Sequence, residues 1–117
     1  MSRRDLKLSA SARHTFKTIK ADALAAKHRR LIDGQTKTSH QEGLFAQVWK
    51  TLDLLAENVR HPGLKTHKYD AIANPVRKGE SVFEAYAQNN TPGAYRVFWC
   101  YGPGDHEVYI VAITPHP

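Results

Sequence analysis

The sequence predicts an α+β fold in which a short N-terminal strand and a two-helix hairpin pack on a C-terminal antiparallel sheet of three or four strands. Apolar residues recur every three or four positions in the first half of the chain, which is typical of helices. In the second half, short aromatic and β-branched runs are separated by turn residues. Helices followed by antiparallel strands indicate an α+β domain, and we expect one domain over residues 1–117.

The first third of the chain predicts a strand and a long helix. Residues 5–9 alternate polar and apolar, as short strands do. Ser9 or Ser11 can cap the helix that follows, and Gly34 is a natural end for it. The apolar positions of this helix recur at helical spacing and are Ala12, Phe16, Ile19, Ala23 and Ala26.

A second helix is expected from about residue 41 to residue 58. Ser39 and Glu42 have the spacing of a capping box, and Pro62 disfavours helix at the residue before it. Its apolar stripe consists of Phe45, Val48, Leu52, Leu55 and Val59. Two consecutive helices with a short polar connection predict an antiparallel helical hairpin.

Three strands are expected after residue 62, over residues 81–86, 95–101 and 107–113. Residues 89–93 have the composition of a turn. The last two strands, joined by a Gly-Pro-Gly-Asp connection, are expected to form a hairpin.

The charge distribution indicates a polyanionic or acidic partner, or else a solvated helix face. The net charge is +6 and the pI is about 9.6. Residues 1–38 hold ten Lys/Arg against three Asp/Glu, whereas the remaining residues hold seven against eight.

Several classes of protein are disfavoured by the sequence. A membrane span needs about 20 apolar residues, and neither such a run nor the apolar segment of a signal peptide is present. The single cysteine, Cys100, can form neither an intrachain disulfide nor a cysteine-based zinc site. Nucleotide-binding, zinc-protease and serine-hydrolase motifs are absent, and the seven histidines show no regular metal-ligand spacing. We therefore expect a cytoplasmic protein without metal, cofactor or membrane partner.

Polar residues in the second half of the chain occupy positions that a sheet can bring together. Glu84 and Tyr86 are two residues apart in one strand, so they share a face. Arg96 stands in an aromatic strand, where it either reaches solvent near the strand start or pairs with Glu84. Antiparallel pairing brings Arg96 and His116 to one end of the sheet. The loop after Pro62 adds Lys65, His67 and Lys68.

Five segments, taken in order, resemble the RelE/ParE toxin superfamily. In that family a loop with "LK" and basic residues follows the second helix, then come a strand, a "YRV" strand, and a final apolar strand followed by His or Arg. The matching segments are residues 61–68 (HPGLKTHK), 83–86 (FEAY), 95–99 (YRVFW), 111–113 (VAI) and 116–117 (HP). The helices match in outline only, because residues 10–38 and the loop at 71–78 are longer than in minimal members.

The resemblance implies a small basic toxin that pairs with an antitoxin protein and acts as a metal-independent, ribosome-dependent mRNA endoribonuclease. RNA is cut without metal when its 2′-OH attacks the adjacent phosphorus, which requires a base, an acid and cations for the phosphate oxygens. By position, Glu84 is the expected base, Arg96 the phosphate stabiliser and His116 the acid. The expected RNA-binding residues are Lys65, His67, Lys68 and Tyr86.

Two alternatives remain open at this point. Some relatives are not nucleases but bind DNA gyrase, and then the helical hairpin carries the function while Glu84 and His116 are dispensable. The other alternative is a nucleic-acid-binding domain that uses the basic residues 1–38. If the chain is a nuclease with an open cleft, substitutions at Arg96 and His116 are expected to leave stability largely unchanged.

Overall fold

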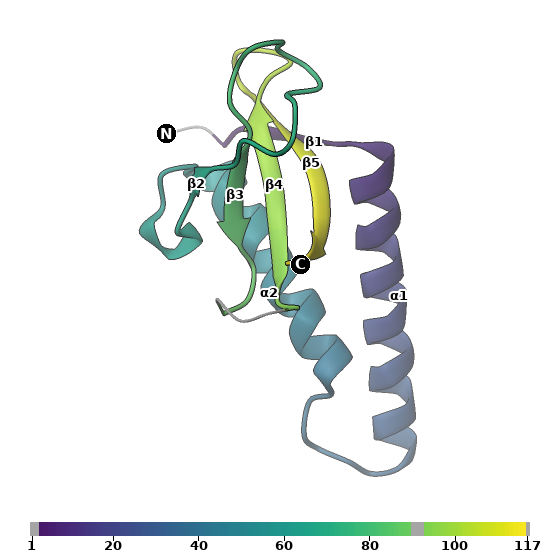
Figure 1. Ribbon diagram of the computed structural model, residues 1–117. Coiled ribbons are helices and arrows are strands. Elements are labelled where there is room, and N and C mark those ends of the chain that lie inside the picture. The colour runs from purple at the N-terminus through teal and green to yellow at the C-terminus, as the bar shows by residue number, and fades with distance from the viewer. Residues whose placement is uncertain (1–2, 90–92, 117) are drawn as a thin grey trace.

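A five-stranded mixed sheet with two helices on one of its faces forms the protein (Figure 1). The computed structural model describes residues 3–89 and 93–116. The strand order is β1-β5-β4-β3-β2; β1 runs parallel to β5, and the other neighbours are antiparallel. The elements in chain order are β1 (Asp5–Leu8), α1 (Ala10–Ile32), α2 (His40–Glu57), the 3₁₀ turn η1 (Pro62–Leu64), β2 (His67–Lys68), β3 (Phe83–Tyr86), β4 (Tyr95–Tyr101) and β5 (Glu107–Pro115).

This architecture confirms the predicted α+β class, with a short first strand, a helical hairpin and four antiparallel strands. The predicted turn at residues 89–93 has its centre, residues 90–92, outside the described part of the chain. Strand β5 runs to Pro115, two residues beyond the predicted end. In residues 3–89 and 93–116, no helix is both long and apolar enough to cross a bilayer.

Both helices begin where the sequence places a capping residue. The Ser9 hydroxyl accepts a hydrogen bond from the Ala12 amide at 2.9 Å, so Ser9 rather than Ser11 caps α1. Gly34 follows the end of α1 with φ +73°, a conformation that glycine adopts without steric cost. Ser39 and Glu42 form the predicted capping box at the start of α2.

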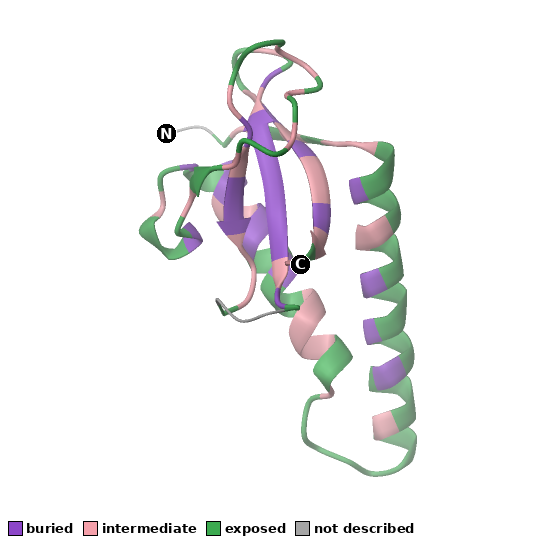
Figure 2. Ribbon diagram, viewed as in Figure 1, coloured by how far each residue is buried: buried purple, intermediate pink, exposed green. Residues whose placement is uncertain are grey.

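The apolar stripes of the two helices build the core on one face of the sheet. Val48, Leu52 and Leu55 of α2 are buried, and in α1 the buried positions turn toward the rest of the protein while the outer face is exposed (Figure 2). From the sheet, Ala85, Val97 and Trp99 join the same core. The two predicted stripes therefore face inward, as amphipathic helices require.

A forked ion pair joins the helices far from the sheet. Arg30 donates from Nε and Nη2 to the two carboxylate oxygens of Glu42, at 2.7 and 2.9 Å. These hydrogen bonds, together with one from the Ser39 amide, lower the pKa of Glu42 to about 2. Arg30 is thus engaged inside the hairpin, whereas Lys17, Lys20 and Arg29 expose their side chains.

The other face of the sheet carries no helix. Successive strand residues point to opposite faces, so Val82, Phe98 and Cys100 form a second, smaller apolar cluster there. The segment between β2 and β3 covers this cluster, and the Tyr69 ring lies 4.7 Å from the Phe98 ring. The same alternation places Glu84 and Arg96 on this helix-free face.

The covering segment is fixed at its ends and in its middle. Asn74 Oδ1 accepts hydrogen bonds from the amides of Val76 and Arg77, which closes a tight turn. Arg77 Nη2 then donates to the carbonyls of Pro103 and Gly104 in the β4–β5 connection, at 3.2 and 3.3 Å. An irregular segment is thereby held over one end of the sheet.

The low pKa of Glu42 predicts how the hairpin responds to acid. A carboxyl with a folded-state pKa of about 2 and an ordinary value of 4.5 stabilises the fold above pH 4.5, and that contribution is lost as pH falls toward 2. The free energy of unfolding of wild type should exceed that of Glu42→Gln at pH 6, and the difference should shrink between pH 4.5 and pH 2. Urea denaturation of both proteins across this range measures it. A difference that stays constant with pH would contradict the ion-pair account.

Candidate active site

Glu84 is a buried carboxylate in the middle of the helix-free face. Its residue is 2% exposed, and its Cα pairs with His67 of β2 on one side and Phe98 of β4 on the other. Taking a carboxylate out of water is costly unless charged or hydrogen-bonding partners surround it. The side chains around Glu84 therefore determine what chemistry this carboxylate can perform.

One oxygen of Glu84 is held by His67. His67 Nε2 lies 2.7 Å from Glu84 Oε1, and His67 Nδ1 lies 3.3 Å from the Lys65 carbonyl oxygen. Both ring nitrogens of His67 thus lie near oxygen atoms, one of a side chain and one of the backbone. The sequence analysis expected His67 to bind RNA; the structure places it in contact with the expected base.

The other oxygen, Oε2, lies between the side chains of His116 and Arg96 without a hydrogen bond. His116 Nδ1 is 3.6 Å from it and Arg96 Nε is 4.0 Å from it. Both separations exceed hydrogen-bond length, and Oε2 accepts no hydrogen bond within the described residues. This oxygen is itself buried, and one of its lone pairs is unused within the described residues.

Arg96 is immobilised on both sides of its guanidinium. Its Cζ lies 4.1 Å from the centroid of the Tyr86 ring, a cation–π contact. Its Nη1 donates to three carbonyl oxygens at 3.2 to 3.3 Å, those of Asn89, Ala94 and Tyr95. Arg96 is fully buried, so the alternative that it reaches solvent is wrong, and so is the expectation that it lines an open cleft. The structure instead pairs Arg96 with Glu84, as the second alternative expected.

His116 directly follows the end of β5, and hydrogen bonds of its backbone hold it in place. Its amide donates to the Ala94 carbonyl at 2.8 Å, and its carbonyl accepts from the Gly93 amide at 3.1 Å. Arg96 pairs in register with Thr114, two residues before His116. The expected convergence of Arg96 and His116 at one end of the sheet is therefore present. The side chain of His116 is 37% exposed.

The two lysines expected to bind RNA lie away from Glu84. Lys68 pairs in register with Phe83, so alternation directs it to the opposite face from His67. Lys65 is exposed, adopts φ +49° and lines a separate hollow beside Phe83 and Trp99. Of the four expected RNA-binding residues, only His67 and Tyr86 touch the Glu84 cluster.

Other chemistry on this chain has less support. Burial raises the pKa of the Cys100 thiol to about 11, so little thiolate exists at neutral pH. No group of three or more His, Cys, Asp or Glu in residues 3–89 and 93–116 is arranged to hold a metal ion.

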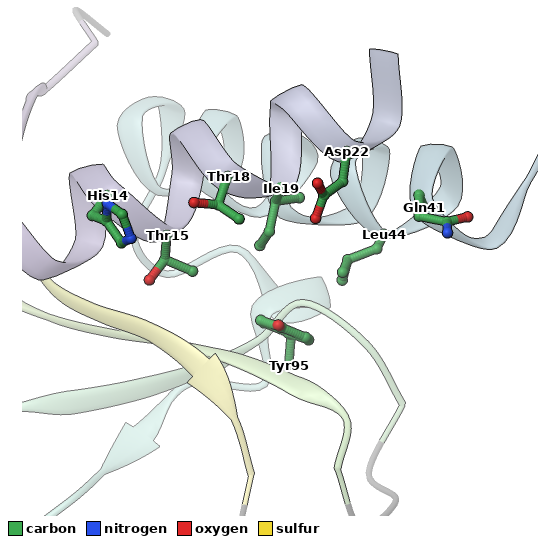
Figure 3. A pocket seen from close by; sticks show the side chains of 8 residues that line it. All are labelled: His14, Thr15, Thr18, Ile19, Asp22, Gln41, Leu44 and Tyr95. Carbon is green, nitrogen blue, oxygen red and sulfur yellow. The ribbon is translucent and has the colours of Figure 1, made fainter. Parts of the chain in front are cut away.

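A separate hollow lies between α1, α2 and β4. Figure 3 shows Ile19 and Leu44 of the helices pointing toward Tyr95 of the sheet across it. The other lining residues are His14, Thr15, Thr18, Asp22 and Gln41. This hollow offers a carboxylate but no lysine or arginine, so it does not suit a phosphate.

Burial of the Glu84–Arg96 pair predicts strongly coupled effects on stability. Arg96→Ala should lower the free energy of unfolding by about 3–5 kcal/mol, because it leaves a buried carboxylate without its guanidinium. Combined with Glu84→Gln, the same change should cost less than the sum of the two single changes. Urea denaturation of the four proteins gives the coupling. Additive effects, or an Arg96→Ala protein as stable as wild type, would show that the two charges do not interact.

Two solved structures of bacterial proteins have a fold similar to that of this chain. The YoeB dimer from Staphylococcus aureus gives a TM-score of 0.56 at 11% sequence identity and covers 99% of this chain and 100% of its own. The YoeB/ParE toxin from Agrobacterium tumefaciens gives 0.61 at 5% identity and covers 97% and 99%. No protein-family model and no curated protein matches the chain. The likeness is one of fold over nearly the whole length, and the chain has the RelE/ParE-like toxin fold that its sequence segments predicted.

Proposed function

We propose that this protein is the toxin of a toxin–antitoxin system and cleaves mRNA on the ribosome without a metal ion. The observation that carries the proposal is the unoccupied lone pair of Glu84 Oε2 between His116 at 3.6 Å and Arg96 at 4.0 Å. Base, cation and acid are the three groups that attack by a 2′-OH requires.

Glu84 acts as the base. His67 holds Oε1 at 2.7 Å, which fixes the carboxylate and leaves Oε2 to take the 2′-OH proton. As that proton leaves, the 2′-oxygen bonds to the adjacent phosphorus and the bond from phosphorus to the 5′-oxygen breaks. The carboxylate must be deprotonated to act as the base in this step.

Arg96 stabilises the charge that develops on the phosphate oxygens. Three carbonyl contacts and the Tyr86 ring fix the guanidinium before substrate arrives. A group that is already in place needs no reorganisation as the reaction proceeds, which is why such donors accelerate reactions strongly.

His116 supplies the proton that the leaving 5′-oxygen needs. Imidazole is the side chain best suited to give a proton near neutral pH. Its side chain is 37% exposed whereas Glu84 and Arg96 are buried, so substrate meets this end of the cluster at His116 and at the half-exposed His67.

The fold supports the toxin part of the proposal, because one of the structural neighbours is named as a YoeB/ParE toxin and the other as a YoeB dimer. Exposed cations of α1, including Lys17, Lys20 and Arg29, suit an acidic antitoxin. Action on ribosomes places the protein in the cytoplasm.

One observation favours a second candidate, a non-enzymatic toxin that binds a protein target such as gyrase. The helical hairpin extends well beyond the sheet (Figure 1) and exposes Leu24, Leu31 and Ile32 of α1. Under that function the hairpin makes the contact, and the Glu84 cluster is structural.

Expression in a bacterial host separates the two functions. Wild type should arrest growth and fragment mRNA, and His116→Ala should lower the rate of mRNA cleavage by about a hundredfold or more. Arg96→Lys keeps the charge but loses the planar fork, so it should retain part of the activity. His28→Ala, an exposed histidine on α1, is the matched control and should behave as wild type.

Each variant is first checked for folding by circular dichroism and urea denaturation. Growth arrest with intact mRNA, or full toxicity of a folded His116→Ala protein, would overturn the nuclease and favour the protein-binding toxin.

A further inference from the structure

A second polar hollow lies around the sheet edge from Glu84, on the face that carries the helices. It has a volume of about 360 Å³ and is bounded by the segment after α2, by η1 and the residues that follow it, and by β3 and β4. An adjoining hollow of about 540 Å³ shares Arg60 and Tyr101 with it and adds Arg4. We name the two together the edge groove.

The edge groove has an aromatic wall. The rings of Phe83 and Trp99 stack at 4.7 Å, and Tyr101 meets Trp99 edge-on at 5.1 Å. Arg4 places its Cζ 5.4 Å from the Tyr101 ring centroid. Trp99 itself is buried, so the half-buried Tyr101 with Arg4 offers the kind of surface on which unpaired bases stack.

Its charge is mainly positive. Arg4, Arg60 and Lys65 line it, against the single carboxylate of Glu57. Within residues 3–89 and 93–116, none of these three cations has a carboxylate at ion-pair distance, unlike Arg30, Arg77 and Arg96 elsewhere. Unneutralised cations along a groove favour phosphate groups.

Two buried donors in the edge groove lack acceptors. Trp99 is 1% exposed, and its Nε1 has no hydrogen-bond partner within the described residues. The Thr66 hydroxyl, also buried, has none either. Both atoms are shielded from solvent, so the groove offers a ligand its cations and its aromatic rim rather than these two donors.

The edge groove is continuous in the chain with the Glu84 cluster. Lys65 and Thr66 line the groove, and His67, the next residue, bonds to Glu84. Strand β2 is the edge of the sheet, so no further strand separates the two places (Figure 1). A single-stranded nucleic acid that lies over Glu84 reaches the edge groove by passing around β2.

We propose that the edge groove binds the single-stranded RNA that flanks the cleaved bond, a role that rests on the proposed nuclease function. Arg60 and Lys65 contact phosphates, and a base stacks against Tyr101 at the aromatic wall. The groove thereby holds the substrate in register with Glu84. An acidic peptide is the rival occupant, since it offers negative charge but no base.

Binding without cleavage tests the groove directly. The probe is a fluorescent RNA of about twelve nucleotides, methylated at every 2′-oxygen so that it cannot be cut. The variant is Arg60→Gln with Lys65→Asn, because asparagine tolerates the positive φ at residue 65. The matched control is Lys50→Gln with Lys37→Asn, which removes the same charge from exposed sites on the hairpin.

Fluorescence anisotropy at several salt concentrations gives the outcome. The groove variant should bind on the order of tenfold more weakly than the control, and its log–log salt slope should be smaller by about 1.4, as expected for two lost phosphate contacts.

Equal affinities and slopes for groove variant and control would overturn the proposal. The proposal would also be overturned if the groove variant lost binding to an acidic peptide while its RNA binding stayed unchanged. Because the probe is not cleaved, these outcomes are independent of the nuclease: wild type that binds through the groove yet leaves mRNA intact refutes the nuclease alone.

Discussion

The burial of the Glu84 carboxylate is the constraint on which the arrangement of side chains around it depends. Glu84, in β3, is 2% exposed. His67 contacts one oxygen of its carboxylate, and Arg96 and His116 lie near the other. Arg96 is in turn held by carbonyls at the start of β4 and by the Tyr86 ring. The surroundings of Glu84 thus depend together on the strand pairing, on the β4–β5 register and on the polar side chains near it.

The asymmetry of the sheet makes room for that arrangement. Both helices pack on one face, and the other is covered only by the segment between β2 and β3. That segment shields Val82, Phe98 and Cys100 and stops short of Glu84, so the polar cluster meets solvent at the two imidazoles. The helical face keeps its own polar feature at the edge, where Lys65 turns away from Glu84.

Most of the fold was predictable because periodicity and capping are local. The Ser39–Glu42 box, the apolar stripe of α2 and the limits of β4 were read directly from the sequence. Alternation and hairpin geometry also brought Glu84, Arg96 and His116 together. The burial of Arg96 was not predictable, because its carbonyl partners leave no signal in residue identity. Nor was the position of His67, since β2 has only two residues and its pairing depends on tertiary contacts.

The chemistry of the cleaved ends tests the central claim most directly. The account requires the RNA's own 2′-OH as nucleophile, with Glu84 taking its proton. Purified protein is given a translated mRNA and a copy with a single 2′-deoxynucleotide on the 5′ side of the cleaved bond. The account predicts products ending in a 2′,3′-cyclic phosphate and a 5′-hydroxyl, and no cut at the deoxynucleotide. Cleavage of the deoxy bond, or products with a 5′-phosphate, would contradict it.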